Sequence, residues 1–507
     1  MDFKHLKSGT DLRGKAIGSD AVLTSETALI LGFAFAGWLK QRSTVTSLRI
    51  AIGRDSRLSG SQLLFAFAQG AAKAGATVLD FGLCTTPAMY QSLKDTSLNL
   101  AASVMVTASH HPADRNGLKF FTKKDGGFSS QLLADFVTYA EHIPKDLPDR
   151  GTKGEVIAAN YLKTYCDALK AKVRKELDTN VARPLLGLHI VVDAGNGAGG
   201  FYAQLLDELG AWTEGSQFLK PDGTFPNHAP NPENEAAMQS ISQAVIAAEA
   251  DLGVIFDADC DRAAIVDAQG NAINRNRLIA LVSAMLLDKL PGITIVTDSV
   301  TSSGLARFIG EWGGEHYRYK RGYRNVIDEA IRLNRSGVNC PLAIETSGHA
   351  AFRDNDFVDD GMYLSTVLIC EAMRLKKEGK SLFSLISGLE EPVESVEIRL
   401  PITAKDYHPA GLRLIEKVME HATFDDKWEI ASDNREGIRI GFDLGGEMDS
   451  GWFLLRMSVH DPVLALNVES DVEGGVKYMI NELYAVIRDA QDIDLSNLES
   501  YENPQEE

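Results

Sequence analysis

The sequence predicts an α/β protein built from three related α/β domains and a smaller C-terminal α+β domain. Strand-like and helix-like segments alternate along most of the chain, which is typical of α/β architecture. An opening of one strand followed by one helix occurs three times at a similar spacing, which indicates related units. A chain of 507 residues is also too long for a single hydrophobic core.

Each opening combines a short apolar strand with an amphipathic helix. In the first, we expect a strand at 48–53, an alanine-rich helix at 62–74 and a strand at 77–80. The second has a strand at 188–193, a glycine-rich turn at 195–200 and a helix to about residue 209, and the third has a strand at 294–298 and a helix at 302–312.

The last part of the chain mixes strands and helices without strict alternation, which favours an α+β domain. The expected elements are a strand at 396–400, a helix at 412–421, strands at 452–457 and 463–468, and a long helix at 472–490. From about residue 499 the chain is acidic and lacks large aliphatic side chains, so we expect a frayed end.

Domain boundaries are expected near 148–154, 269–271 and 391–392. The resulting division is 1–150, 151–270 and 271–391 as three α/β domains, 392–490 as the α+β domain, and 491–507 as an acidic tail.

Composition and charge exclude several classes of function. The net charge of −19 argues against nucleic acid or an anionic membrane as the main partner. There is no long uncharged apolar stretch and no apolar leader, so neither a transmembrane helix nor secretion is expected. Five widely spaced cysteines without a CxxC pair make disulfides and a structural zinc site improbable. We therefore expect a cytoplasmic protein.

Ser109 is the candidate nucleophile. It lies in the loop Thr107–Pro112, directly after an apolar strand-like run, and Lys119 follows after an Asn-Gly turn. A hydroxyl at a strand end with a cation nearby suits phosphoryl transfer to and from serine. A Ser-His-Asp hydrolase is an alternative, although the sequence lacks the GxSxG nucleophile elbow.

The second candidate is an acidic triplet, Asp257, Asp259 and Asp261, between two strand-like runs. Three crowded carboxylates repel one another unless a cation neutralises them. An EF-hand does not fit, because Arg262 stands where the calcium loop needs glycine and Ala268 where it needs glutamate. Three carboxylates at alternate positions, with a fourth oxygen from elsewhere, suit Mg²⁺.

Two polar loops suggest ligand binding. Glu345 and Ser347 follow an apolar run, and a carboxylate beside a hydroxyl can bind the vicinal hydroxyls of a sugar. Arg456 and Ser458 lie between the two late strands and can bind phosphate, because arginine offers a fork of donors.

Basic loops must overcome the negative charge of the chain if it binds phosphate esters. The candidates are the loop at 8–14 with Arg13, the loop at 53–57 with Arg54 and Arg57, and the cluster at 320–324 with Lys320 and Arg324.

Together these motifs resemble the α-D-phosphohexomutase superfamily, which includes phosphoglucomutase, phosphomannomutase and phosphoglucosamine mutase. The resemblance covers roughly residues 8 to 490 and is collinear. The matching segments are SGTDLRG, GRDSRLSG, TASHHP with NGLK, DADCDR, KRGYR, ETSGH and RMSVHDP.

The resemblance implies four domains around a central cleft and a role for each motif. Ser109 would be the phosphoserine and would ligate Mg²⁺ together with Asp257, Asp259 and Asp261. Proton transfer or stabilisation of the reacting phosphate would fall to Lys119, His110 and Arg13. Substrate would be bound by Lys320, Arg324, Glu345, Ser347, His349, Arg456, Ser458 and His460.

Departures from the family pattern indicate a divergent branch. His111 replaces the usual asparagine, and Val459, His460 and Asp461 replace Gly, Thr and Glu of the phosphate loop. His460 could substitute for the threonine as a donor. Tyr323 stands where mutases of dual specificity often carry histidine.

The predicted function is reversible phosphoryl transfer between the 1- and 6-positions of hexose phosphates, through a phosphoserine and a hexose 1,6-bisphosphate that also serves as activator. Glucose and mannose phosphates are the favoured substrates. The alternatives are phosphoglucosamine mutase, a phosphosugar-binding protein with reduced turnover, and a metal-dependent phosphatase. We expect the protein to bind a small-molecule hexose phosphate. We expect it to be a monomer or a dimer.

Overall fold

The computed structural model describes residues 2–42, 47–148, 154–445, 449–458 and 461–502. The chain forms two compact units. The first comprises Met1–Asn274 and Ser347–Ser384, and the second comprises Arg275–Thr346 and Leu385–Glu507.

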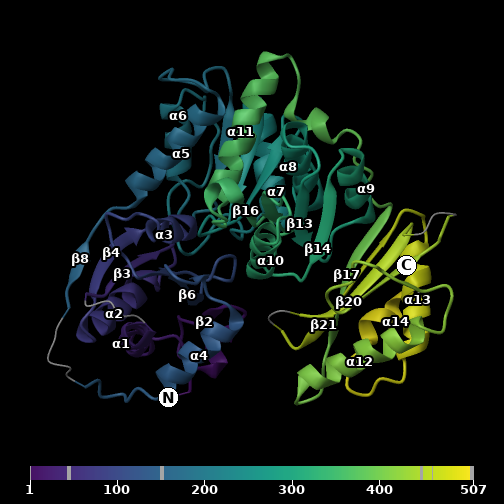
Figure 1. Ribbon diagram of the computed structural model, residues 1–507, viewed down its shortest axis with the longest axis horizontal. Coiled ribbons are helices and arrows are strands. Elements are labelled where there is room, and N and C mark those ends of the chain that lie inside the picture. Colours follow the sequence, from purple (N-terminus) through teal and green to yellow (C-terminus); the bar gives the residue numbers. More distant parts are fainter. Residues whose placement is uncertain (1, 43–46, 149–153, 446–448, 459–460, 503–507) are drawn as a thin grey trace. The chain divides into compact units, whose positions relative to one another are not determined.

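An eight-stranded mixed sheet organises the N-terminal part of the first unit (Figure 1). Its main path is β1-β2-β6-β5-β3-β4-β8, and β7 pairs with β6. The strands are β1 (Lys7–Ser8), β2 (Asp11–Lys15), β3 (Arg49–Arg54), β4 (Thr77–Leu83), β5 (Ala102–Val106), β6 (Arg115–Thr122), β7 (Gly126–Gly127) and β8 (Val156–Ala158). The helical segments are η1 (Lys4–Leu6), α1 (Ser25–Arg42), α2 (Gly60–Lys73), α3 (Thr86–Ser92) and α4 (Ser130–Glu141).

The register of this sheet brings two strand ends together. Strands β3 and β5 are parallel, and Arg54 pairs with Val106 at their C-terminal ends. Strand β6 returns antiparallel to β5. The segments that follow β3 and β5 therefore leave the sheet at the same edge, and one of them carries Ser109.

The rest of the first unit contains a four-stranded sheet in the order β12-β11-β10-β9. Parallel β9 and β10 continue into the antiparallel hairpin β10–β11, whose loop carries the acidic triplet. The elements are α5 (Leu162–Glu176), β9 (Ile190–Asp193), α6 (Phe201–Glu208), α7 (Glu235–Ala248), β10 (Leu252–Phe256), β11 (Ala263–Asp267), β12 (Ala272–Ile273), β16 (Ala350–Phe352), η2 (Arg353–Asn355) and α11 (Gly361–Lys377).

The second unit begins with three parallel strands in the order β14-β13-β15. Its first elements are α8 (Arg275–Lys289), β13 (Thr294–Asp298), α9 (Ser303–Glu311), β14 (Glu315–Tyr319), α10 (Tyr323–Arg335) and β15 (Leu342–Ile344). The short helix η3 (Leu382–Ile386) crosses the division between the units.

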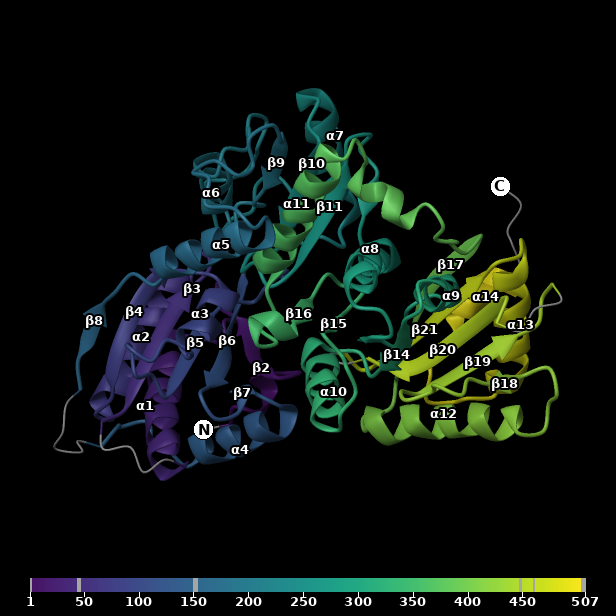
Figure 2. The same ribbon diagram turned by 45° about the horizontal axis from the view of Figure 1, so that its top comes forward.

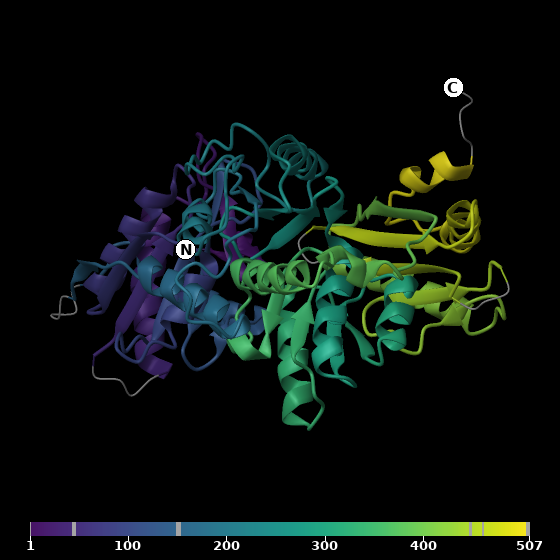
Figure 3. The ribbon, with the colours of Figure 1, turned by 90° about the horizontal axis from the view of Figure 1, so that it is seen from above.

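The C-terminal part of the second unit is an antiparallel sheet in the order β17-β21-β20-β19-β18. Three helices contribute to one hydrophobic core with this sheet (Figures 2 and 3). The elements are β17 (Glu394–Pro401), α12 (Tyr407–Ala422), β18 (Glu429–Ile430), β19 (Ile438–Phe442), β20 (Gly451–Met457), β21 (Val463–Ser470), α13 (Gly475–Ile487) and α14 (Ser496–Glu502).

The expected α/β class and the α+β C-terminal part are confirmed, and each expected strand or helix has a counterpart in the structure. The acidic end differs from expectation up to residue 502, because α14 forms there. Leu495 and Leu498 are buried in the C-terminal core and hold this helix in place. Residues 503–507 lie outside the described part of the chain.

None of the helices in the described ranges is long and apolar enough to cross a membrane.

Helices α1 and α2 cross at glycines in the core of the N-terminal sheet domain. A Cβ on Gly32 would lie 2.0 Å from the Phe67 carbonyl oxygen, and one on Gly70 would lie 1.9 Å from that of Leu29. The two backbones therefore touch where side chains would keep them apart.

We expect Gly32→Ala to lower the free energy of unfolding by about 1–3 kcal/mol, because the added methyl group overpacks the crossing. Gly310→Ala is the matched control: a Cβ there meets no atom within 4 Å, and alanine should stabilise α9 by about 0.5–1 kcal/mol. Urea unfolding followed by circular dichroism measures both. Equal stability of the two variants would contradict the close crossing.

Candidate active site

Ser109 lies in the loop between β5 and β6, and its hydroxyl is held by two charged side chains. The residue has a left-handed backbone conformation, with φ of 51°, and is 3% exposed. Its Oγ donates a hydrogen bond to Asp257 Oδ2 at 2.8 Å and accepts one from Arg262 Nη2 at 3.1 Å. The candidate nucleophile and the acidic loop, far apart in sequence, are therefore in direct contact.

The acidic loop buries its three carboxylates completely. Asp257, Asp259 and Asp261 are each 0% exposed, and one ligand atom from each lies within 4.8 Å of the others. Burial and the charges of Asp259 and Asp261 raise the pKa of Asp257 well above its ordinary value. Such crowding costs free energy unless cations compensate it.

Two cations from the same unit provide that compensation. Lys119 Nζ contacts Asp259 Oδ2 at 3.4 Å and also donates to Asp261. Arg262 donates from Nε to Asp257 Oδ2 at 3.1 Å. Burial alone would raise the pKa of Asp261, but Lys119, His349 and Arg262 hold it well below its ordinary value.

The carboxylate oxygens left over fit a divalent cation. Among the described residues, Asp259 Oδ1 and Asp261 Oδ1 are buried without a hydrogen-bond partner. Hard anionic oxygens at this spacing are the ligands that Mg²⁺ prefers. The triplet therefore fits a metal ion in both chemistry and geometry.

His110 lies next to the nucleophile and is neutral. Its Nδ1 is 3.4 Å from Ser109 Oγ, and its ring stacks on that of His111. Above all, the positive charge of Arg262 holds the pKa of His110 well below its ordinary value. The imidazole ring is therefore uncharged beside the Ser109 hydroxyl.

Arg13 is the other cation expected near the nucleophile. It lies on β2, paired across the sheet with Gly117 on β6, and is 9% exposed. Its Nη2 forms an ion pair with Asp11 Oδ2 at 2.8 Å.

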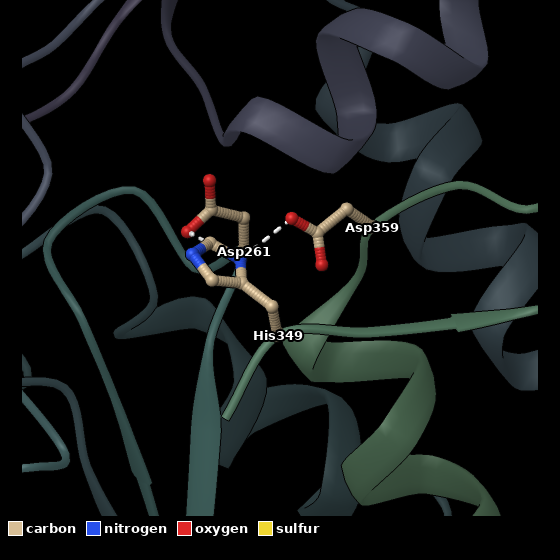
Figure 4. Close-up of side chains that lie close together, drawn as sticks. All are labelled: Asp261, His349 and Asp359. Carbon is tan, nitrogen blue, oxygen red and sulfur yellow. Dashed lines mark ion pairs between the residues drawn. The ribbon is translucent and has the colours of Figure 1, made fainter. Parts of the chain in front are cut away.

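His349 joins the metal loop. Its ring lies between two carboxylates, with Nδ1 at 2.6 Å from Asp359 and at 3.8 Å from Asp261 (Figure 4). Burial alone would lower its pKa, but these two carboxylates outweigh the burial and raise the pKa to about 9. The imidazolium therefore adds a third positive charge beside the triplet. Ser347, earlier in the same segment, is buried.

Glu345 belongs to the second unit and directly follows β15. Its Oε1 accepts a hydrogen bond from the Gly322 backbone N–H at 2.6 Å, which ties it to the KRGYR loop. The neighbouring Thr346 Oγ1 donates to Asp298 Oδ2 at 2.7 Å. These contacts fix the loop that follows the strand.

Arg456, near the end of β20, is 4% exposed and lies among charged side chains of both signs. Burial and the neighbouring Arg321 lower its pKa, whereas Glu436, Glu397 and Asp298 act in the opposite direction. An arginine buried among charges of both signs is a candidate anion binder within the second unit.

The remaining substrate candidates differ in their surroundings. Lys320 is exposed after β14, and Arg324 pairs with Asp328 one turn along α10, at 2.6 Å. Ser458 is half-buried, and its Oγ accepts a hydrogen bond from the Asp461 N–H at 3.3 Å. His460 lies outside the described residues.

Several residues without a predicted role also lie at the site. Arg262 ends the DADCDR segment and donates hydrogen bonds to both Ser109 and Asp257. Thr86 donates from Oγ1 to Asp259 Oδ2 at 2.5 Å, and Asp359 pairs with His349. Arg262 could have been found from its position directly after Asp261, but no local sequence pattern marks Thr86 or Asp359.

Comparison with known proteins identifies the family of this chain. Three family models match the chain, described as phosphoglucomutase/phosphomannomutase alpha/beta/alpha domains I, II and III, over residues 5–142, 163–270 and 274–392. A phosphomannomutase/phosphoglucomutase of Pseudomonas syringae pv. tomato is 31% identical over 488 residues, which cover 96% of each chain. A phosphoglucomutase of Neisseria gonorrhoeae is 29% identical over 481 residues, covering 94% of this chain and 95% of the relative.

A solved structure extends the similarity to the whole fold. The phosphoglucomutase/phosphomannomutase family protein of Burkholderia thailandensis superposes with a TM-score of 0.77 at 27% identity, covering 97% of this chain and 98% of the other. The family models, the full-length relatives and the shared fold establish that this chain belongs to the phosphoglucomutase/phosphomannomutase family.

Proposed function

We propose that this phosphohexomutase transfers a phosphoryl group between the 1- and 6-positions of a hexose phosphate through a phosphorylated Ser109. The observation that carries the proposal is the contact of Ser109 Oγ with Asp257 and Arg262, inside a loop that fits a divalent cation. Phosphoglucomutase or phosphomannomutase activity is favoured, and phosphoglucosamine mutase is the alternative.

In the first half-reaction, a sugar hydroxyl attacks the phosphorus of phosphoserine. The new sugar O–P bond forms as the Ser109 Oγ–P bond breaks, giving a hexose 1,6-bisphosphate. After reorientation, Ser109 Oγ attacks the other phosphate, so that the serine is phosphorylated again and a hexose monophosphate leaves. The bisphosphate can therefore also act as activator of unphosphorylated enzyme.

The residues around Ser109 supply the electrostatics. Phosphoserine carries about two negative charges at neutral pH, which repel an approaching hydroxyl. Arg262 contacts the bridging oxygen and can stabilise its developing charge. Mg²⁺ held by Asp257, Asp259 and Asp261, with Ser109 as further ligand, would neutralise the phosphate. Lys119 and Arg13 add cationic groups, and His110, whose Nδ1 lies 3.4 Å from Ser109 Oγ, would take part in proton transfer.

Substrate recognition is assigned mainly to the second unit. Arg456 and Ser458, with His460, would bind the phosphate that does not react. Glu345, together with Ser347 and His349, would bind sugar hydroxyls. Lys320 and Arg324 would attract the phosphorylated substrate electrostatically.

Two other functions are separable from this one. A phosphosugar-binding protein would bind hexose phosphate without turnover, and a phosphatase would release inorganic phosphate without isomerisation. The contact of Ser109 with the acidic loop favours the mutase. A ³¹P NMR assay with glucose, mannose and glucosamine 1-phosphates and a trace of bisphosphate distinguishes all three and identifies the sugar.

Ser109→Ala should abolish turnover, because no other hydroxyl is held between Asp257 and Arg262 among the described residues. After incubation with bisphosphate, intact-mass analysis should show a phosphate adduct on the wild-type protein and none on the variant. Ser97→Ala, on the exposed turn before β5, is the control and should keep the adduct. Full mutase turnover by Ser109→Ala would exclude the phosphoserine.

Asp259→Asn should weaken Mg²⁺ binding at least roughly tenfold, because one anionic ligand is lost from the triplet. Calorimetric titration with Mg²⁺ measures the binding directly, and activity at fixed Mg²⁺ should fall in parallel. The exposed Asp207→Asn serves as control. Unchanged Mg²⁺ affinity in Asp259→Asn would place the metal elsewhere.

Arg456→Ala should raise KM about ten- to a hundredfold, because a charge-assisted contact is worth about 1.5–3 kcal/mol. Arg456→Lys should restore only part of the affinity, because a point charge cannot copy the guanidinium fork. Arg413→Ala, an exposed arginine paired with Asp492, controls for the loss of charge. An unaltered KM in Arg456→Ala would remove Arg456 from phosphate binding.

A further inference from the structure

Arg57 is fully buried beneath the Ser109 loop, although the basic loop at 53–57 was expected to offer its arginines to phosphate. The residue follows β3 and is 1% exposed. Its guanidinium points at the backbone of the loop between β5 and β6. Nη1 donates to the carbonyl oxygens of Pro112 at 2.7 Å and Arg115 at 2.9 Å, and Nη2 donates to those of Ser109 at 2.5 Å and His111 at 2.6 Å.

The fifth N–H of the guanidinium is also used. Nε donates to Asp55 Oδ2 at 3.2 Å. An arginine side chain has five N–H groups, so every donor of Arg57 has an acceptor within the protein. A phosphate oxygen could bind only by displacing one of these bonds, so Arg57 is not a phosphate ligand.

Asp55 extends the network to the other end of the loop. Its Oδ2 accepts a hydrogen bond from Thr107 Oγ1 at 2.7 Å, and Thr107 Oγ1 in turn accepts one from the Ser109 N–H at 2.9 Å. The backbone of Ser109 is thereby fixed on both sides. Its N–H is held through Thr107 and Asp55, and its carbonyl is held directly by Arg57.

A loop of the same unit shields this network from water. The Phe225 ring lies 5.1 Å from the Arg57 guanidinium carbon. Gly223 packs so closely on the 56–58 backbone that a Cβ there would lie 2.5 Å from Ser56 O and from Leu58 N. Hydrogen bonds excluded from water are stronger and more rigid than exposed ones.

The fixed backbone has a conformation that serine adopts only at some cost. A left-handed φ at a residue other than glycine persists only where its surroundings enforce it. Relaxation of Ser109 to an ordinary φ would swing its side chain away from Asp257 and Arg262. The four carbonyl contacts of Arg57 oppose that relaxation.

We propose that Arg57 is the positioning residue of this enzyme, which holds the Ser109 loop in its left-handed conformation so that the hydroxyl meets Asp257 and Arg262. The inference rests on the proposed role of Ser109 as phosphoryl carrier. Lysine cannot replace Arg57, because one ammonium group cannot reach four carbonyl oxygens and a carboxylate in one plane.

The test compares Arg57→Lys and Arg57→Ala with Arg49→Lys, using the full chain. Arg49 is the matched control, because it is an arginine at the start of β3, the strand that Arg57 follows, and it donates to the Leu98 carbonyl at 2.8 Å. We expect kcat of the Arg57 variants to fall about ten- to a hundredfold, because small misplacements of a nucleophile are costly. KM should stay within about twofold, because the substrate-binding residues are untouched.

Two further readouts separate positioning from a general loss of structure. Guanidinium ion added at concentrations far below denaturing ones should restore part of the kcat of Arg57→Ala and none of that of Ser109→Ala, with urea as control. Should the Arg57 variants not fold, Thr107→Val breaks the same network at its other end and should lower kcat in the same manner.

The outcomes distinguish this inference from the proposed function. Wild-type kcat in Arg57→Lys or in folded Arg57→Ala, with Ser109→Ala inactive, would overturn the positioning role and leave the phosphoserine intact. A loss of kcat in Arg57→Ala that guanidinium does not relieve, with kcat of Thr107→Val unchanged, would overturn it as well. Turnover by Ser109→Ala would instead overturn the proposed function.

Discussion

The first unit depends on the neutralisation of three buried carboxylates. Asp257, Asp259 and Asp261 are inaccessible to water, and their mutual repulsion is strong in a medium of low polarity. Lys119 and Arg262 offset this repulsion, and imidazolium His349 adds to them. The charge balance is made by side chains from separate segments, so the hairpin loop can keep its shape only when these segments are folded around it. The same charges make the loop fit for a divalent cation.

Strand topology brings the Ser109 loop into contact with this charge cluster. Parallel β3 and β5 end at the same edge of the sheet, so the Arg57 segment and the Ser109 loop emerge together. The β10–β11 hairpin supplies the carboxylate that meets the serine hydroxyl. The Arg57 segment thus holds the Ser109 loop in place, and the charged side chains of the acidic loop contact the Ser109 hydroxyl oxygen. An enzyme that transfers phosphate needs both, because positioning and electrostatic stabilisation are the main contributions a protein can make to that reaction.

In the second unit, buried arginines are stabilised by acidic neighbours. The chain is strongly acidic, with a net charge of −19, and phosphate esters are anions. Arg456 is nevertheless buried beside Arg321, and acidic neighbours such as Glu397 and Glu436 keep the group stable. Local pairing of opposite charges therefore lets cationic side chains be buried close together despite the negative charge of the whole chain. The hydrogen bond from the Gly322 N–H to Glu345 connects the loop after β14 with the loop after β15.

The sequence by itself determined the α/β class, the order of the motif loops and the identity of Ser109 and the acidic triplet as candidates, because strands, turns and crowded carboxylates leave local patterns. It did not distinguish Arg54 from Arg57, and it expected both to face phosphate. Only the tertiary structure decided that Arg57 is buried against four carbonyl oxygens, that His349 pairs with Asp359, and that Arg262 contacts Ser109. The physical reason is that the partner of a charged side chain comes from strands distant in sequence. Strand pairing and burial decide which donor meets which acceptor. The residues next to a charged side chain in sequence determine neither the pairing nor the burial.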